Sequence, residues 1–167
     1  MSAIIIYFSR NGNNYVNGTI KNLETGNTEI AANILQKITS ADIFKIEPVV
    51  PYSTDYSQCI DQAKQDKSRN ARPEIKIYPG SLDKYDTIYL GYPNYWGTMP
   101  MVMFTFLDKF NLSGKTIMPF CTHEGSGIGS SESDIKKLCP NADVKKGLPI
   151  HGAKANDSES IFKRWIK

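Results

Sequence analysis

The sequence predicts an α/β fold in which a parallel β-sheet lies between layers of helices. Four short apolar runs, at 3–8, 43–46, 87–92 and 116–122, recur along the chain. Helical patterns of apolar residues separate these runs, which is typical of βα units around a parallel sheet. A chain of 167 residues that is 40% hydrophobic and 22% charged also has the size and balance of a compact domain.

The first apolar run, 3–8, is expected to form a buried strand that begins the sheet. The segment after it, 11–26, is rich in Asn and Gly. It is far longer than the roughly two to six residues that usually join a strand to its helix, and loops of that length are usually functional or mobile. Apolar and polar residues alternate around Tyr15, Val16 and Ile20, which is compatible with a small hairpin.

Three helices are expected between the strands. The first opens near Asn27-Thr28, the second starts around Asp55 and ends before Pro73, and the third covers 101–110. The residues expected to face inward are Ile30, Ala31, Ile34, Leu35 and Ile38 in the first helix, Tyr56, Cys59, Ile60 and Ala63 in the second, and Met101, Phe104, Phe106, Leu107 and Phe110 in the third.

The last part of the chain adds two helices and one strand to this pattern. Ser131, followed three residues later by Asp134, resembles a capping box, so a helix is expected from there through Leu138. An edge strand around 144–151 brings the count to five. No linker or composition shift marks a second domain, so residues 1–167 are expected to form one. The apolar residues of the final helix are Ile161, Phe162, Trp165 and Ile166.

Charge and chain start exclude some functions. A net charge of +3 is too small and too dispersed to predict nucleic-acid binding. The run 3–8 has no basic region before it and is too short for a signal core or a membrane span. We therefore expect a cytoplasmic protein that does not associate with membranes.

The cysteines and histidines predict neither disulfides nor a metal site. Cys59, Cys121 and Cys139 form an odd set without a CxxC spacing, so reduced thiols are expected. His123 and His151 are the only two histidines, so the sequence does not indicate a clustered metal site.

Ligands of an open parallel sheet bind outside the carboxyl ends of its strands, so the loops at those ends are the candidate site. The first strand ends in Ser9-Arg10, and the next helix opens with Gly26-Asn27-Thr28. Backbone N–H groups, the positive end of a helix dipole and short hydroxyls are what a phosphate needs. The same residues are also explained if Asn27 or Thr28 only caps its helix and Ser9 only ends a strand.

The loop after the third strand carries two adjacent aromatic residues, Tyr95 and Trp96, in a turn bounded by Gly and Pro. Exposed aromatic pairs in a loop usually have a partner for their apolar surface. A planar ring stacked on Trp96, or on Tyr95, would bury it. In the alternative, both side chains pack down on the edge of the sheet.

The loop after the fourth strand, 121–129, is rich in glycine, which permits close backbone approach to a flat ligand. It matches neither a GxGxxG fingerprint nor a nucleophile elbow. Cys121 and His123 are two residues apart and could in principle form a thiolate–imidazole pair. A buried, inert Cys121 is the favoured interpretation, because nothing nearby in the sequence orients the imidazole.

Four motifs in this order resemble the flavodoxin family, and more closely its bacterial flavodoxin-like branch with an insertion in the phosphate loop. They are Tyr-Phe-Ser-Arg at 7–10, Gly-Asn-Thr-Glu at 26–29, Gly-Tyr-Pro-Asn-Tyr-Trp-Gly at 91–97, and Pro-Phe-Cys-Thr-His-Glu-Gly-Ser-Gly at 119–127. The resemblance covers essentially the whole chain. It implies a three-layer flavodoxin-like sandwich whose five-stranded parallel sheet has the order 2-1-3-4-5.

The resemblance also implies flavin mononucleotide (FMN) as the cofactor. Its phosphate would lie in the first loop, its isoalloxazine ring beside the second, and its pyrimidine end at the third. No catalytic side chain is implied. The cofactor-binding residues would be Ser9, Arg10, Asn11, Asn27 and Thr28 in the first loop, Pro93, Asn94, Tyr95, Trp96 and Gly97 in the second, and Thr122, His123, Glu124, Gly125, Ser126 and Gly127 in the third.

The function implied is electron transfer through bound FMN, with a redox partner protein or a small-molecule electron acceptor. An alternative is an NAD(P)H-dependent quinone or nitro reductase on the same fold. A sequence pI near 8.7 and His123 in place of a third-loop aromatic keep that alternative open, because electron-carrier flavodoxins are typically acidic and often place an aromatic there. A flavin-free binding domain is a second alternative, disfavoured because all three loops are retained. The oligomeric state is left open.

Overall fold

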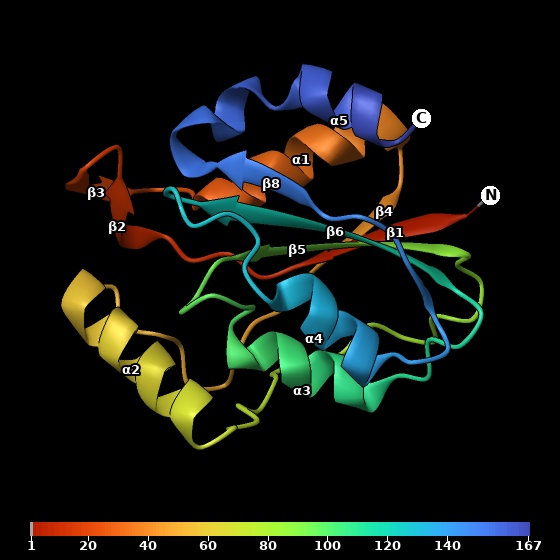
Figure 1. Cartoon of the computed structure of the whole chain (residues 1–167), viewed down its shortest axis with the longest axis horizontal. Coiled ribbons are helices and arrows are strands. Elements are labelled where there is room, and N and C mark those ends of the chain that lie inside the picture. The colour runs from red at the N-terminus through yellow and green to blue at the C-terminus, as the bar shows by residue number, and fades with distance from the viewer. Residues whose placement is uncertain (1) are drawn as a thin grey trace.

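The computed structural model of the chain describes residues 2–167. A parallel sheet lies between two layers of helices, and a separate hairpin stands at one end (Figure 1). In chain order the strands are β1 (Ala3–Tyr7), β2 (Gly12–Val16), β3 (Thr19–Leu23), β4 (Asp42–Lys45), β5 (Thr87–Pro93), β6 (Thr116–His123), β7 (Asp143–Val144) and β8 (Leu148–His151). The helices are α1 (Asn27–Thr39), α2 (Tyr56–Ser68), α3 (Met101–Lys109), α4 (Ser131–Leu138) and α5 (Glu159–Trp165), with a 3₁₀ helix, η1 (Gly152–Asp157), before the last.

The main sheet has the order β4-β1-β5-β6-β7, and β8 also pairs with β6. All of these strand pairs are parallel. With β7 and β8 as the two parts of the fifth strand, this order is the predicted 2-1-3-4-5. The α/β flavodoxin-like fold is therefore confirmed.

The fifth strand is formed in two pieces rather than as one continuous strand over 144–151. β7 pairs with the start of β6, and β8 pairs with its far end. Between them, the N–H of Gly147 donates to Glu132 Oε2 of α4 at 3.0 Å. A Cβ on Gly147 would lie 2.1 Å from a side-chain carbon of Ile128. The chain thus leaves the sheet briefly to pack against the segment that leads into α4.

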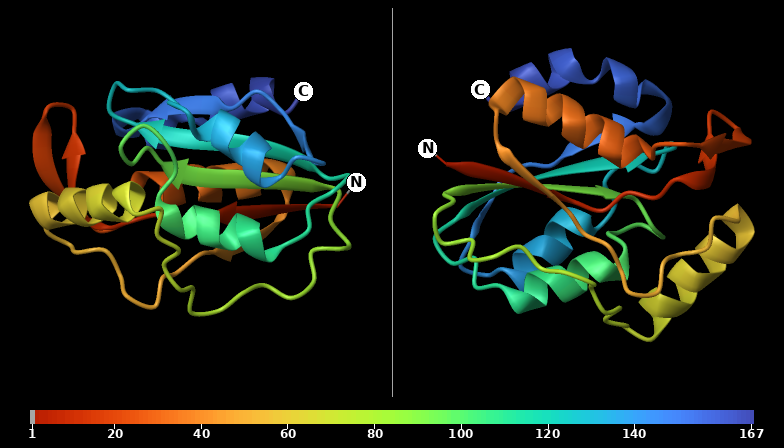
Figure 2. Two further views of the ribbon diagram at one scale, coloured as in Figure 1. Left: turned by 60° about the horizontal axis from the view of Figure 1, so that its bottom comes forward. Right: turned by 180° about the vertical axis from the view of Figure 1, so that it is seen from behind.

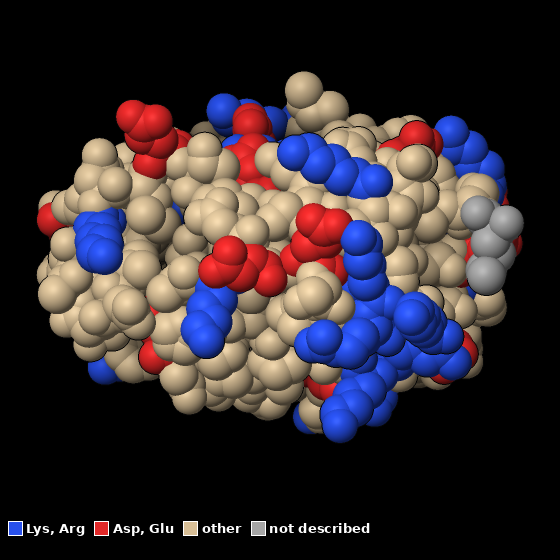
Figure 3. Space-filling model, turned by 90° about the horizontal axis from the view of Figure 1, so that it is seen from above, with Lys and Arg blue, Asp and Glu red and all other residues tan. Residues whose placement is uncertain are grey.

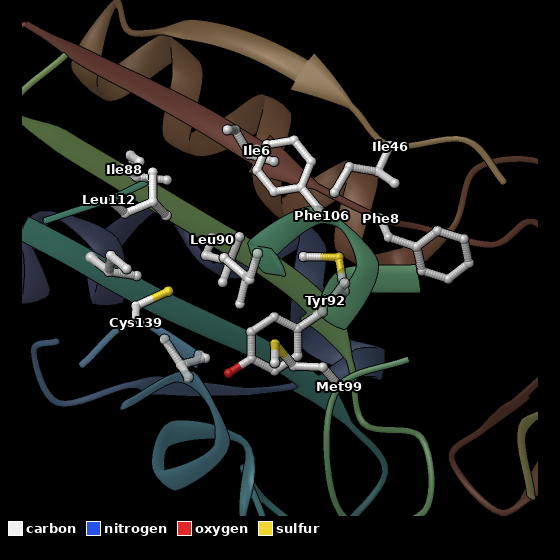
Figure 4. Packing of buried hydrophobic residues seen from close by; sticks show 14 of the residues in the cluster. Ile6, Phe8, Ile46, Ile88, Leu90, Tyr92, Met99, Phe106, Leu112 and Cys139 are labelled. Atoms are coloured by element: carbon white, nitrogen blue, oxygen red, sulfur yellow. The ribbon is translucent and has the colours of Figure 1, made fainter. Parts of the chain in front are cut away.

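Helices α1 and α5, with η1, cover one face of the sheet, and α3 and α4 cover the other (Figures 1 and 2). Side chains of β1 alternate between the two faces. Ile4 and Ile6 belong to the core under α3 and α4, whereas Ile5 belongs to the core under α1 and α5. Figure 4 shows the first of these clusters, in which Ile6 and Leu90 from neighbouring strands are packed with Phe106 of α3. Both faces of β1 are buried, as expected for a central strand of a parallel sheet.

The predicted hairpin in the long first loop is present as β2 and β3. Its turn residues Asn17 and Gly18 both have positive φ, 54° and 87°, which Asn-Gly adopts readily. In both views of Figure 2 the hairpin lies beside α2, at the end of the molecule opposite the termini. A 2.9 Å hydrogen bond from the Asn13 N–H to the Thr54 carbonyl joins it to the segment before α2.

The helices form where the periodicity places them, although one inward face is broader than expected. In α3, Val102 and Met103 are fully buried, whereas Phe104 and Phe110 are only partly buried. This helix contacts α2 and α4 and also packs on the sheet, so its buried surface is wider than one apolar stripe. No helix among residues 2–167 is long and apolar enough to cross a membrane.

The capping box predicted at the start of α4 is wrong. Ser131 is fully buried, and its hydroxyl donates to the Ile128 carbonyl at 2.6 Å and accepts from the Tyr92 hydroxyl at 2.9 Å. These contacts in the core occupy the oxygen that a cap would use. The N-cap residue is Ser130, and its side chain makes no capping hydrogen bond.

Candidate functional site

A pocket of about 490 Å³ lies at the carboxyl ends of β1, β5 and β6. This is where ligands bind in open α/β sheets. The hairpin and α2 add two walls that belong to neither the sheet nor its flanking layers. The lining residues are Ser9, Arg10, Asn14, Tyr15, Asn27, Thr28, Tyr56, Cys59, Ile60, Ala63, Pro93, Asn94, Tyr95, Trp96, Gly97, Thr122, His123, Glu124, Ser126 and Gly152.

The structure brings most of the sequence-predicted site residues together in this pocket, from all three loops. Asn11, Gly125 and Gly127 are not among the lining residues. Asn11 is exposed at the start of the hairpin. The Gly127 carbonyl accepts a hydrogen bond from the Asn94 side chain at 2.8 Å, so this glycine ties the second and third loops to each other.

The start of α1 forms an anion cradle at one end of the pocket. The backbone N–H groups of Asn27 and Thr28 donate to no other group in residues 2–167, whereas the third N–H of the helix, that of Glu29, donates to Ser9 Oγ at 3.1 Å. A Cβ on Gly26 would lie 2.3 Å from Ser9 Oγ and 2.5 Å from the Arg10 carbonyl oxygen. Ser9 therefore caps the helix from another segment, and two donors and the positive end of the helix dipole are left for a ligand.

Arg10 adds a positive charge to the pocket wall, where its guanidinium reaches the segment before α2 and the hairpin. It is buried, and its guanidinium donates to the carbonyls of Ser53 and Thr54 at 2.8 and 3.1 Å and to Asn14 Oδ1 at 3.1 Å. No carboxylate among the described residues lies within ion-pair distance of it. A buried cation without a counter-ion favours an anionic ligand beside it.

The aromatic pair of the second loop divides into one buried and one exposed residue. The ring of Tyr95 packs edge-on against Phe8 and Tyr52, with centroids 6.1 and 5.6 Å away, and burial raises its pKa well above the usual value. Trp96 is 45% exposed, and its Nε1–H donates to the Ile60 carbonyl of α2 at 2.8 Å. Of the two aromatic residues, only Tyr95 is packed into the protein, so the alternative in which both are packed against the sheet holds for Tyr95 alone.

The third loop places His123 and Glu124 in the pocket wall. His123 Nδ1 accepts from the Gly125 N–H at 2.9 Å, and the rings of His123 and His151 meet edge-on at 5.7 Å. Burial and the neighbouring His151 lower the pKa of His123. Glu124 Oε2 lies 3.7 Å from His151 Nε2, whereas Glu124 Oε1 is buried and has no hydrogen-bond partner among the described residues.

The three cysteines are free and buried. Cys121 is fully buried, and burial strongly raises its pKa, which keeps the thiol protonated and unreactive. Its Sγ donates to backbone carbonyls of Thr122 and Gly127 at 3.6 and 3.8 Å. A thiolate–imidazole pair with His123 is therefore absent, and the favoured interpretation of Cys121 is confirmed.

Several lining residues were not predicted as part of the site. Cys59, Ile60 and Ala63 were expected only to face inward from a helix, and the periodicity could not show that this face covers a pocket. Tyr15 of the hairpin stacks on Tyr56 of α2, with centroids 6.2 Å apart. The remaining unpredicted residues are Asn14 and Gly152. The unusual length of the first loop was the one feature of the sequence that indicated a functional role for the hairpin residues.

Comparisons with known proteins agree with this architecture. A family model described as flavodoxin matches residues 22–167. No curated protein matches significantly. Candidate flavoproteins from Bacteroides eggerthii and Bacteroides uniformis are each 27% identical to the chain. Their TM-scores are 0.74 and 0.77, and the alignments cover 97% and 99% of this chain and 98% and 97% of theirs.

A flavoprotein from Lactobacillus acidophilus, solved in complex with FMN, has a TM-score of 0.71 at 19% identity, over 99% of both chains. At that identity the likeness shows the fold alone. The family model, by contrast, spans most of the chain and agrees with the observed sheet order. This chain therefore belongs to the flavodoxin family.

Proposed function

We propose that the chain binds FMN in this pocket and transfers electrons through it. The observation that carries the proposal is the anion cradle, in which two N–H groups at the start of α1 have no partner among residues 2–167, in a pocket that the buried cation Arg10 also lines. A flavin phosphate is an anion of the kind such a cradle binds. Bound FMN would supply the redox chemistry, as cofactors do in general.

The residues present fit the parts of FMN from one end of the pocket to the other. Asn27, Thr28 and Ser9 would hold the phosphate, with Arg10 adding charge. Trp96, at the second loop, offers an exposed aromatic face for the ring. The apolar side of α2, through Ile60 and its neighbours, would exclude water from the ring. The Lactobacillus acidophilus flavoprotein, which shares the fold and was solved with FMN, supports FMN as the ligand.

The proposed setting is the cytoplasm, where the three free and buried cysteines would stay reduced. A redox partner protein or a small-molecule acceptor would take the electrons.

Titration of the purified protein with FMN and with riboflavin tests the proposal. Because the cradle binds the phosphate, we expect FMN to bind at least ten times more tightly than riboflavin, as measured by quenching of flavin fluorescence. Equal affinities would contradict the phosphate assignment. No binding of either flavin would favour the flavin-free binding domain instead.

A reductase that acts on quinones or nitro compounds is the second candidate. Trp96 and Tyr15, from the second loop and the hairpin, are 45% and 41% exposed at the rim of the pocket. Exposed aromatic surface of this kind fits a second planar substrate.

A further inference from the structure

Glu124 connects the third loop to the inserted hairpin. Its Oε2 accepts a hydrogen bond of 3.1 Å from the backbone N–H of Asn17, the first residue of the hairpin turn. The two residues are far apart in sequence, and the contact fastens the tip of the hairpin to the pocket wall. On the other side of the pocket the hairpin is held at its base by Asn13 and Thr54. The hairpin is therefore attached on both sides of the site.

The second carboxylate oxygen of Glu124 has no partner. Oε1 is buried, and no donor among residues 2–167 reaches it. A buried carboxylate oxygen without a hydrogen bond is unfavourable, so this atom is available to accept one from a donor group in the pocket. Glu124 lines the pocket, and a ligand there can supply one.

The position of Oε1 limits which part of a ligand can donate to it. A Cβ built on Gly152 would lie 2.4 Å from Glu124 Oε1 and 2.6 Å from Asn27 Nδ2. Both atoms therefore lie close to Gly152, next to the start of α1. A phosphate has no proton to spare for a carboxylate and is repelled by it. In FMN the groups adjoining the phosphate are the hydroxyls of the ribityl chain, which donate readily.

We propose that Glu124 couples cofactor binding to closure of the hairpin: Oε1 accepts a hydrogen bond from a ribityl hydroxyl, while Oε2 holds the Asn17 N–H. This inference rests on the proposed function. When both oxygens are hydrogen-bonded, the carboxylate of Glu124 is fixed in orientation. Binding of the flavin therefore strengthens the contact with Asn17, and the contact with Asn17 strengthens binding of the flavin. Glu124 is thus a binding residue for the sugar-alcohol part of the cofactor and a positioning residue for the hairpin.

The binding half is tested with Glu124→Ala and three flavins: FMN, riboflavin and lumiflavin, which lacks the ribityl chain. We expect the variant to bind FMN and riboflavin about ten-fold more weakly or worse, the range for a lost hydrogen bond to a charged group. Its affinity for lumiflavin should be unchanged. Equal losses for all three flavins, no loss, or tighter FMN binding would overturn the contact.

Glu24→Ala is the matched control, because Glu24 is exposed beside the hairpin and its removal changes the net charge equally. It should bind all three flavins as the unaltered protein does. Gly152→Ala is a second variant that keeps the carboxylate but displaces it, and it should weaken riboflavin binding as Glu124→Ala does. Circular dichroism of each variant shows whether the fold is intact.

The coupling half is measured by hydrogen exchange at the hairpin amides. In the unaltered protein FMN should slow exchange of the Asn17 N–H, and in Glu124→Ala that amide should exchange faster without flavin and be insensitive to FMN. Exchange at Asn17 that is equal in both proteins would refute the coupling. If the unaltered protein binds no flavin, the proposed function fails, whereas the flavin-free exchange comparison still decides whether Glu124 holds the hairpin.

Discussion

Among single residues, Gly26 determines how closely two segments approach at the anion cradle. Its φ of −66° is ordinary, so the need for glycine is steric rather than conformational. A Cβ would lie 2.3 Å from Ser9 Oγ and 2.5 Å from the Arg10 carbonyl oxygen. The hydroxyl could rotate away, but it would then lose the hydrogen bond from Glu29, and the carbonyl cannot move without the backbone.

The substitution Gly26→Ala should therefore lower both stability and phosphate affinity. We expect a loss of about 1–3 kcal/mol in the free energy of unfolding, the usual cost of overpacking, and a larger loss of affinity for FMN than for riboflavin. Urea denaturation and flavin titration measure the two effects. Gly80→Ala is the control, because no atom lies within 4 Å of its Cβ position, and it should leave both quantities nearly unchanged. Equal effects of the two substitutions would contradict the steric account.

At the scale of secondary-structure elements, α2 differs from the other helices because it serves the pocket more than the core. Its buried residues are Cys59 and Ala63, and both line the pocket. Helix α2 begins after Asp55, whose carboxylate accepts a hydrogen bond of 2.9 Å from the Gln58 N–H. The cap acts together with the contacts that α2 makes with Trp96 and with Tyr15 of the hairpin, and with little buried surface in the helix its loss should be felt locally.

Replacing Asp55 with Ala should loosen this wall of the pocket. We expect a loss of about 0.5–2 kcal/mol in the free energy of unfolding, faster hydrogen exchange in α2 and weaker FMN binding. Asp61→Ala removes the same charge from an exposed position in the same helix and should have little effect. If Asp55→Ala leaves exchange in α2 unaltered, the cap does not hold this helix.

The elements themselves could be predicted well from the sequence, because strands and helices follow local periodicity. The hairpin followed from alternation around Tyr15 and Ile20, and its Asn-Gly turn fits that pattern. Where the structure differs from the prediction, the cause is an interaction between residues that are distant in sequence. Ser131 was expected to cap a helix, but its hydroxyl is hydrogen-bonded in the core, where it accepts from Tyr92 of β5. The hydrogen bond between Gly147 and α4 interrupts the last strand. Neither partner is visible in a local pattern.

The place of the candidate site was predictable from the topology of the sheet. Loops that follow neighbouring parallel strands must meet, so Ser9, Trp96 and His123 were expected at one edge and lie in one pocket. The α2 wall and Gly152 were missed because their place depends on how distant segments pack. Asn11, expected at the phosphate, is exposed and does not line the pocket, so its contact stays a prediction.

At the scale of the whole molecule, the face seen from above carries its charges unevenly. Lys and Arg side chains gather toward the end that holds both termini, and charges of both signs are scattered toward the hairpin end, on the face seen from above (Figure 3). With a net charge of only +3, strong electrostatic steering of a partner to the pocket is not expected. Recognition at the pocket would depend instead on exposed apolar groups such as Trp96.

Direct reduction by nicotinamide cofactors separates a carrier from a reductase. The 167 residues contain no GxGxxG dinucleotide fingerprint, so we expect NADH and NADPH to reduce the FMN-loaded protein slowly. Anaerobic stopped-flow mixing, which follows bleaching of the flavin absorbance, measures the rate, and dithionite is the control that shows the flavin is reducible. Bleaching within seconds, followed by turnover with a quinone, would favour the reductase.

The central position of β1 also has a consequence for synthesis on the ribosome. β1 is synthesised before its neighbour β5, in which Thr87 pairs with Ala3 and which is made about 84 residues later. At about 5–20 residues per second, roughly 4–17 s pass before that partner exists. β4 can pair with one edge of β1 sooner, and α1 can cover one of its faces. The edge that later pairs with β5, along Ile4, Ile5 and Ile6, stays open to pairing with other nascent chains. The yield of folded protein is therefore sensitive to whatever shields this one strand during those seconds of translation.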